Sequence, residues 1–105
     1  MTAATRTLSA IAAGLLFSFP ASAANYQIVI SGYAFTKVPA TAHVGDVVEW
    51  VNKDATEHTA TANDGSFNAT LAPGKSFRFS LKKPGKVAFH CRYHSYMTGA
   101  IDVVP

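Results

Sequence analysis

The alternation of apolar and polar side chains with a period of two constrains this chain more than any other feature of its sequence. Phe77, Phe79 and Leu81 alternate with two serines and an arginine, and four other segments repeat the pattern: 26–30, 47–51, 86–90 and 100–103. Successive side chains of a β-strand point to opposite faces of a sheet, so a half-buried strand has this period. Almost no stretch after residue 25 repeats every 3.6 residues, as an amphipathic helix would. The fold is therefore expected to be all-β.

Turn-forming residues separate these segments at short intervals. They stand at Gly45-Asp46, Asn63-Asp64-Gly65, Pro73-Gly74 and Pro84-Gly85. Short strands divided by such turns, with no helix between them, are typical of an antiparallel sandwich or barrel. The 105 residues leave no room for a second domain, and the sequence contains no internal repeat or low-complexity stretch.

The first 23 residues differ in kind from the rest, and we interpret them as a secretory signal peptide. Arg6 precedes an apolar run over 8–19, and Ala21-Ser22-Ala23 has the small-x-small pattern of a signal-peptidase site. The run is short for a bilayer span, and an N-terminal membrane anchor is the alternative. The absence of a twin arginine favours export of the unfolded chain. We expect a leader over 1–23 and one domain over 24–105, located in the periplasm.

Charge narrows the classes of partner. From residue 24 onward, eight Lys and Arg residues stand against six Asp and Glu residues, a net charge of +2. A nucleic-acid-binding domain is usually far more basic. We therefore expect a soluble monomer that binds no nucleic acid and does not insert stably into a membrane.

The single cysteine, Cys91, raises the question on which the function depends. An exported domain of about eighty residues has only a small hydrophobic core, and such domains are often stabilised by disulfides or bound metals. A disulfide within the chain is excluded because there is no second cysteine. Three roles remain for this thiol: an intermolecular disulfide, a reactive nucleophile, or a metal ligand.

The residues around the cysteine favour the metal. Cys91, His94 and Met97 lie three residues apart between two expected strands. A thiolate, an imidazole and a thioether are donors that suit copper in either oxidation state. Two histidines and a cysteine with a distant axial methionine form the blue-copper arrangement. The second histidine is expected to be His58, which follows the strand after residue 46 and a polar loop.

The two other histidines, His43 and His90, are interpreted as structural. His90 directly precedes Cys91 on a strand, so its side chain should point to the opposite face. His43 is expected to be an exposed residue at a strand end.

The whole segment after residue 24 resembles the cupredoxin family. The resemblance rests on Ala34-Phe35 with Pro39, the run from Val44 to Asp54, His58-Thr59, the turns Pro73-Gly74 and Pro84-Gly85, and the loop Cys91–Met97. Among cupredoxins the chain is most similar to the amicyanins, which have the same compact Cys-x-x-His-x-x-Met loop. The resemblance implies a Greek-key β-sandwich of about eight strands and one type 1 copper ion held by His58, Cys91, His94 and Met97. The chain departs from the amicyanins at Thr59, where they commonly have Asn, and at Tyr93 and Ser95, where they have prolines.

The resemblance also implies the function. It is that of a small blue copper protein that shuttles single electrons between redox partners in the periplasm, as copper cycles between Cu(I) and Cu(II). The partners are expected to be redox proteins such as a c-type cytochrome or a periplasmic dehydrogenase. Four protein ligands leave no open coordination position for a substrate, so no enzyme activity is expected.

Two alternative functions are weighed against electron transfer. The first is a periplasmic copper-binding or copper-delivery protein, which would use similar soft ligands but keep the metal exchangeable. The second is an enzyme with Cys91 as nucleophile and His94 or His58 as base. Nothing in the sequence resembles an oxyanion element, and this second alternative leaves Met97 without a role.

Overall fold

A computed structural model describes residues 22–105, which form nine β-strands and no helix. The strands are β1 (Asn25–Ile30), β2 (Phe35–Thr36), β3 (Thr41–His43), β4 (Val47–Asn52), β5 (His58–Ala62), β6 (Asn68–Leu71), β7 (Ser76–Ser80), β8 (Gly85–His90) and β9 (Thr98–Val104). The expected all-β fold is confirmed, with nine strands in place of about eight. The predicted signal peptide lies outside the described residues except for its last two positions. None of the described residues belongs to a helix with the length and apolar character needed to cross a membrane.

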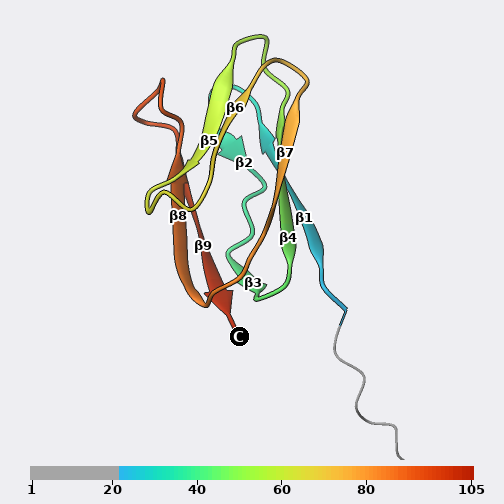
Figure 1. Ribbon diagram of the computed structural model, residues 1–105. Helices are drawn as coiled ribbons and strands as arrows, with labels where there is room; N and C mark the ends of the chain where they lie inside the picture. Colours follow the sequence, from blue (N-terminus) through green and yellow to red (C-terminus); the bar gives the residue numbers. More distant parts are fainter. Residues whose placement is uncertain (1–21) are drawn as a thin grey trace, which may run out of the picture.

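The strands form two sheets that pack face to face (Figure 1). The order is β2-β1-β4-β7 in one sheet and β3-β9-β8-β5-β6 in the other. The chain passes from one sheet to the other five times, for example between β4 and β5 and between β7 and β8. This arrangement is the β-sandwich that the cupredoxin resemblance implies. Its crossing connections gather loops at the two ends of the sandwich.

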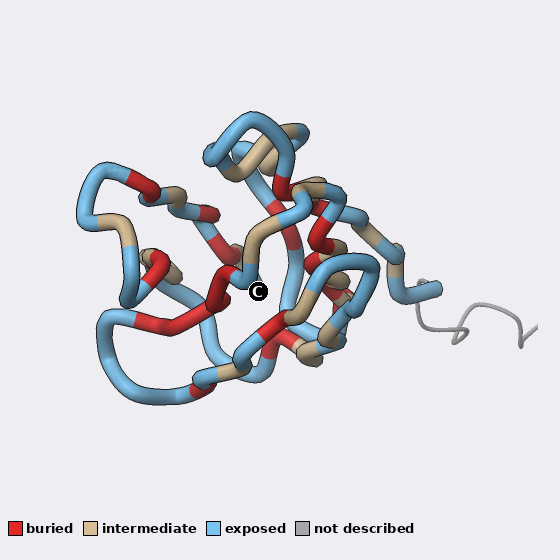
Figure 2. The backbone as a smooth tube through the Cα atoms, turned by 90° about the horizontal axis from the view of Figure 1, so that it is seen from above, coloured by how far each residue is buried: buried red, intermediate tan, exposed pale blue. Residues whose placement is uncertain are grey.

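Aromatic rings from both sheets fill the centre of the sandwich. Trp50 in β4 is fully buried, and its ring centroid lies 4.9 Å from that of Phe67, 5.3 Å from Phe89 and 5.9 Å from Phe77. β4 is buried at every second residue, as the alternation predicts. Burial of side chains of this size stabilises the fold by about 1.5–3 kcal/mol each. Figure 2 shows buried segments in the interior, with exposed loops around them.

The sheets are mixed, which the turn signals did not predict. β1 runs parallel to β4 over six residue pairs, and β3 runs parallel to β9 over three. The other five pairings are antiparallel. The expectation of antiparallel pairing is therefore wrong for β1 with β4 and for β3 with β9. A tight turn predicts only the pairing of strands that follow one another, whereas parallel pairs join distant segments through crossover connections.

The two ends of the sandwich carry different loops. The upper end in Figure 1 has the loops 31–34, 53–57 and 91–97, and the lower end has the turns 44–46 and 81–84. At the lower end, the carboxylate of Asp46 accepts the N–H of Ala24 and the N–H of His43, each at 2.8 Å. Backbone hydrogen bonds join the two turns, since Gly45 N–H donates to the Leu81 carbonyl at 2.7 Å. The lower end is thus closed by backbone groups and one carboxylate.

Candidate metal centre

His58 is the first residue of β5 and directly follows the loop 53–57. Its side chain is fully buried, and its Nε2 lies 2.9 Å from Oδ2 of Asp54. An ionised carboxylate only accepts hydrogen bonds, so Nε2 is the donor in this contact. A neutral ring then carries its lone pair on Nδ1, which faces Cys91 Sγ at 3.9 Å. The fold thus presents the lone pair of His58 toward the thiol.

The loop 91–97 brings the other sequence-predicted residues to the same end. It connects β8 to β9, and two backbone hydrogen bonds shape it: Cys91 N–H donates to the Met97 carbonyl at 3.1 Å, and Met97 N–H donates to the His94 carbonyl at 2.9 Å. The first bond places Cys91 and Met97 side by side at the base of the loop, where both are 1% exposed. His94 lies further out and is only half-buried.

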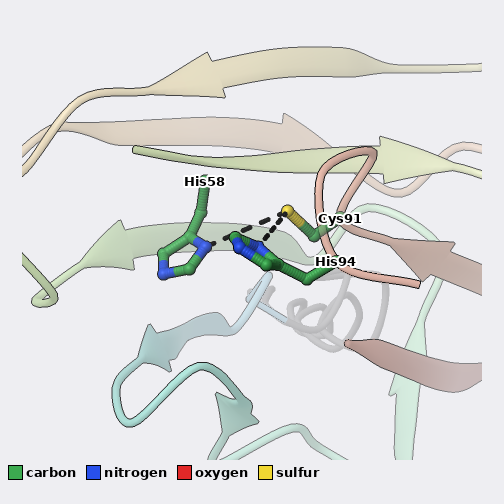
Figure 3. A group of neighbouring side chains, drawn as sticks. All are labelled: His58, Cys91 and His94. Carbon is green, nitrogen blue, oxygen red and sulfur yellow. Dashed lines mark hydrogen bonds between the residues drawn. The ribbon is translucent and has the colours of Figure 1, made fainter. Parts of the chain in front are cut away.

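Three donor atoms converge at the upper end. Cys91 Sγ lies 3.7 Å from His94 Nδ1 and 3.9 Å from His58 Nδ1, and one donor atom from each of the three residues lies within 4.8 Å of the others. Figure 3 shows the two imidazoles and the sulfur pointing toward one another. A metal about 2.0–2.3 Å from each of three donors in a trigonal arrangement would place these donors roughly 3.5–4 Å apart. The spacing therefore fits one ion.

The chemistry of the donors fits copper. Two imidazoles and a thiolate are the trigonal ligands of a blue-copper site, and the thioether of a nearby methionine is its weak axial ligand. Met97 is buried at the base of the same loop as Cys91 and His94. His58, Cys91, His94 and Met97 are thus positioned as a type 1 copper site.

Thr59 links β5 to the ligand loop in two ways. Its N–H donates to Cys91 Sγ at 3.4 Å, and such hydrogen bonds tune a coordinated sulfur. Its hydroxyl accepts the N–H of Arg92 at 2.8 Å. Because the Thr61 hydroxyl donates to Asn68 Oδ1, the Thr59 hydroxyl is the donor in the 2.9 Å contact between the two threonines. Thr59 therefore joins the two halves of the site even though it replaces the asparagine common in amicyanins.

Asp54 is a second residue in contact with the site, and sequence reasoning did not assign it a role. Besides His58, its carboxylate accepts the N–H of Gly32 at 2.8 Å and the N–H of Tyr33 at 2.9 Å. Desolvation raises the pKa of this carboxyl, but the hydrogen bonds from Tyr33, Gly32 and His58 outweigh it, and the pKa lies below its usual value. Asp54 is therefore an anion that joins the loop 31–34 to the buried histidine.

Three exposed tyrosines surround His94. The centroid of its ring lies 5.0 Å from that of Tyr33, 6.0 Å from Tyr96 and 6.4 Å from Tyr93. The hydroxyl of Tyr93 donates to Glu57 at 2.8 Å, and this hydrogen bond raises the pKa of Tyr93. Tyr93 and Tyr96 flank His94 in the loop 91–97, whereas Tyr33 comes from the loop 31–34 and only the folded chain brings it to the His94 ring.

The two remaining histidines lie away from the donors. His90 forms a 2.6 Å hydrogen bond between its Nδ1 and Oδ1 of Asn63. His43 is exposed at the end of β3, at the lower end of the sandwich. Neither belongs to the cluster of donor atoms that the described residues form.

The fold and the site together define a class of protein: a one-domain β-sandwich with a copper-type donor set between the loops at one end. A family model described as a cupredoxin-like domain matches residues 4–103. The chain belongs to the cupredoxin family. No curated protein matches the sequence.

Solved structures agree with this assignment. The copper-containing nitrite reductase of Thermus scotoductus SA-01 is similar over 84% of this chain and 24% of its own, at 25% identity and a TM-score of 0.69. A purple cupredoxin from Nitrosopumilus maritimus is similar over 74% of this chain and 98% of its own, at 22% identity and a TM-score of 0.66. The oxidised state of a proline-to-alanine mutant of amicyanin is similar over 75% of this chain and 81% of its own, at 20% identity and a TM-score of 0.66. The chain thus spans about a quarter of the nitrite reductase, and it shares the fold of whole single-domain cupredoxins.

Proposed function

We propose that this protein is a small blue copper electron carrier that binds one copper through His58, Cys91, His94 and Met97. The convergence of two imidazole nitrogens on the buried Cys91 sulfur is the observation that supports it most directly. Copper bound there would pass single electrons by cycling between Cu(I) and Cu(II).

The four candidate ligands would have different roles at such a site. Cys91 and His58 are almost fully buried and hydrogen-bonded, so the fold would hold these two ligands in place. Met97 would supply a thioether donor. His94 is half-buried, and its outer edge is the shortest route for an electron between the site and the surface. With four protein donors, no coordination position stays open for a substrate, so we propose no enzyme activity.

The cellular location and the redox partners are part of the same proposal. A leader over 1–23 would be removed on export, and the domain over 24–105 would act in the periplasm as a monomer. Its electron donor and acceptor would be redox proteins such as a c-type cytochrome or a periplasmic dehydrogenase.

The test is copper binding by the domain over 24–105. We expect one Cu(II) per chain, an intense thiolate-to-copper band in the visible spectrum and reversible one-electron reduction. Cys91→Ser should abolish the band, since a serine hydroxyl is not a soft donor. His43→Asn, at the lower end, is the matched control and should leave it unchanged. A band that persists in Cys91→Ser would disprove the site.

The role of Met97 has its own test. Met97→Leu removes a weak axial donor and keeps a side chain of similar volume, so the colour should remain while the reduction potential moves. Complete loss of copper in this variant would contradict the axial role.

Burial of the donors favours electron transfer over copper delivery. Cys91 and Met97 are each 1% exposed and His58 is fully buried, whereas a delivery protein needs ligands that a recipient can reach. We expect loss of Cu(I) to a chelator to take far longer than electron exchange with a small reductant. Rapid loss of Cu(I) would instead support delivery.

A further inference from the structure

Tyr33 lies against both histidines of the candidate metal centre. Its ring centroid is 5.0 Å from that of His58 and 5.0 Å from that of His94, with interplanar angles of 89° and 76°. The two imidazoles are themselves 5.2 Å apart, so the three rings form a triangle. These edge-to-face distances and angles are those that aromatic rings prefer. Tyr33 is 39% exposed, so its ring covers the histidines from the solvent side of the loop 31–34.

The backbone of Tyr33 is held in a conformation that a non-glycine residue seldom adopts. Its φ is 58°, and the preceding Gly32 has a φ of 61°. A side chain with a Cβ is strained in this left-handed region. Asp54 accepts the N–H groups of both residues, and the Tyr33 hydroxyl lies 2.7 Å from Thr56 Oγ1. Strain of this kind persists where the surroundings impose it, and it is frequently found at functional sites.

The two histidines differ in their hydrogen-bond partners. His58 has a hydrogen-bond partner at each ring nitrogen, Asp54 at Nε2 and Cys91 at Nδ1. In the described part of the chain, Cys91 is the only hydrogen-bond partner found for the His94 ring. A metal-binding histidine usually has a partner at its second nitrogen, which fixes the orientation of the ring. The described contacts of the His94 ring are instead with the rings of Tyr33, Tyr93 and Tyr96.

We propose that Tyr33 is a positioning residue of the metal centre. Its ring holds the imidazole of His94, and to a lesser degree that of His58, in the orientation in which both Nδ1 atoms face Cys91. Asp54 and Thr56 in turn hold Tyr33 in place. The inference rests on the proposed copper function for the identity of the metal, while the orientation of His94 is a property of the copper-free chain as well.

Four variants separate the ring from the backbone conformation. Tyr33→Gly removes the ring and relieves the strain, because glycine adopts a positive φ freely. Tyr33→Asn is a second ring-free variant that tolerates the same conformation. Tyr33→Phe keeps the ring and loses the contact with Thr56. Lys37→Gly is the matched control, since Lys37 is the other non-glycine residue with a positive φ, 61°, and it is exposed.

The first measurement is the affinity for Cu(I), by competition with a chromogenic chelator. Loss of a residue that orients a metal ligand costs about 10–100-fold in metal affinity. We expect a loss in this range for Tyr33→Gly and Tyr33→Asn, recovery of most of the affinity in Tyr33→Phe, and no change in Lys37→Gly. Wild-type affinity in both ring-free variants would overturn the proposal.

The second measurement separates this proposal from the proposed function. In the copper-free protein, the His94 ring should give nuclear Overhauser contacts to the Cβ protons of Cys91, because His94 Nδ1 lies 3.7 Å from Cys91 Sγ. These contacts should weaken in both ring-free variants and persist in Tyr33→Phe and Lys37→Gly. If the wild-type chain bound no copper while these contacts behaved as expected, the copper function would fail and the positioning of His94 would stand. Unchanged contacts in the ring-free variants would show that Tyr33 does not position the ring.

Discussion

The parallel strands β1 and β4 are closed at each end by an aspartate, and the two closures differ in what else they touch. At the lower end, Asp46 precedes β4 and accepts the N–H groups of Ala24 and His43. At the upper end, Asp54 follows β4 and accepts the N–H groups of Gly32 and Tyr33. Only Asp54 also contacts a side chain of the candidate metal centre, His58, at 2.9 Å.

Asp46 therefore stabilises the fold at the lower end, whereas Asp54 both stabilises the fold and orients a candidate ligand at the upper end. Both carboxylates satisfy backbone donors that would otherwise lack a partner at the strand ends. The extra hydrogen bond of Asp54 determines which nitrogen of His58 carries the proton. One neighbouring histidine is thus enough to give a structural contact a second role at the site. Changes at the two ends should therefore have separable effects.

Removal of copper should produce the largest effect, and it should be greater at the upper end. A ligand that binds only the folded state at 1,000 times its dissociation constant stabilises it by about 4 kcal/mol. The copper-free domain should therefore melt well below the copper form. Hydrogen exchange should accelerate more at the amides of Cys91 and Met97 than at those of Gly45 and Leu81. An equal acceleration at both ends would break the comparison.

Gly99→Ala should have the next largest effect. Gly99 in β9 pairs with Phe89 in β8, and a Cβ at this position would overlap the Phe89 ring. That ring cannot move aside freely, because it packs against Phe35 at 4.9 Å and Trp50 at 5.3 Å. Overpacking of this kind costs about 1–3 kcal/mol. Urea unfolding should show the loss, while the exposed neighbour Thr98→Ala should unfold nearly as the wild type does.

The aspartates provide the direct test. Asp46→Asn should lower the stability and leave copper affinity unchanged, whereas Asp54→Asn should lower both. Hydrogen bonds from Ala24 and His43 lower the pKa of Asp46, so its charge stabilises the fold fully above the unfolded value of about 4 and progressively less as the pH falls below it. The stability difference between wild type and Asp46→Asn should therefore be largest at neutral pH and shrink below about pH 4. Loss of copper affinity in Asp46→Asn would contradict the separation of the two ends.

Surface charge should give the smallest effect. Arg92 is exposed in the loop 91–97, whereas Lys82, Lys83 and Lys86 lie in or beside the turn at the lower end. If electrons enter at the upper end, Arg92→Glu should slow reduction of the copper form by ferrocyanide, an anion, more than the triple change of the lysines to Glu. The difference should shrink with added salt, because the screening length is about 10 Å at 0.1 M. The rate of reduction of Arg92→Gln should lie between the rates of the wild type and Arg92→Glu. Equal slowing by Arg92→Glu and the triple variant would place electron entry elsewhere.

The fold could be predicted where strands are half-buried. The alternation of polarity identified β1, β4, β7, β8 and β9, each of which has one face toward the core. It could not identify β5, because all five of its residues, His58–Ala62, are buried and its threonines satisfy their hydroxyls within the protein. The parallel pairing of β1 with β4 could not be predicted either, since no local turn joins these strands.

The site could be predicted as far as its donor types and spacing allow. Cys91 and His94 share one loop, and His58 was found by its position after a strand; the structure brings all three together. Tyr33 and Asp54 were missed because tyrosines and aspartates are common in loops and carry no metal signal of their own. Their role depends on the folded chain, which places the loop 31–34 beside the loop 53–57.

The hydrogen bond between Ala24 and Asp46 would have a further consequence if the predicted leader is cleaved. If the leader is removed after Ala23, as the sequence predicts, the nitrogen that Asp46 holds at 2.8 Å becomes the first atom of the mature chain. An α-amino group has a usual pKa of about 8, so this nitrogen is a cation at neutral pH. Cleavage would then replace a neutral amide donor to the ionised carboxylate by a cation, which makes the contact an ion pair. A leader cut one residue earlier or later would not place the new terminal charge at this distance. In this way the lower end would distinguish a chain cleaved after Ala23 from a chain cleaved one residue to either side.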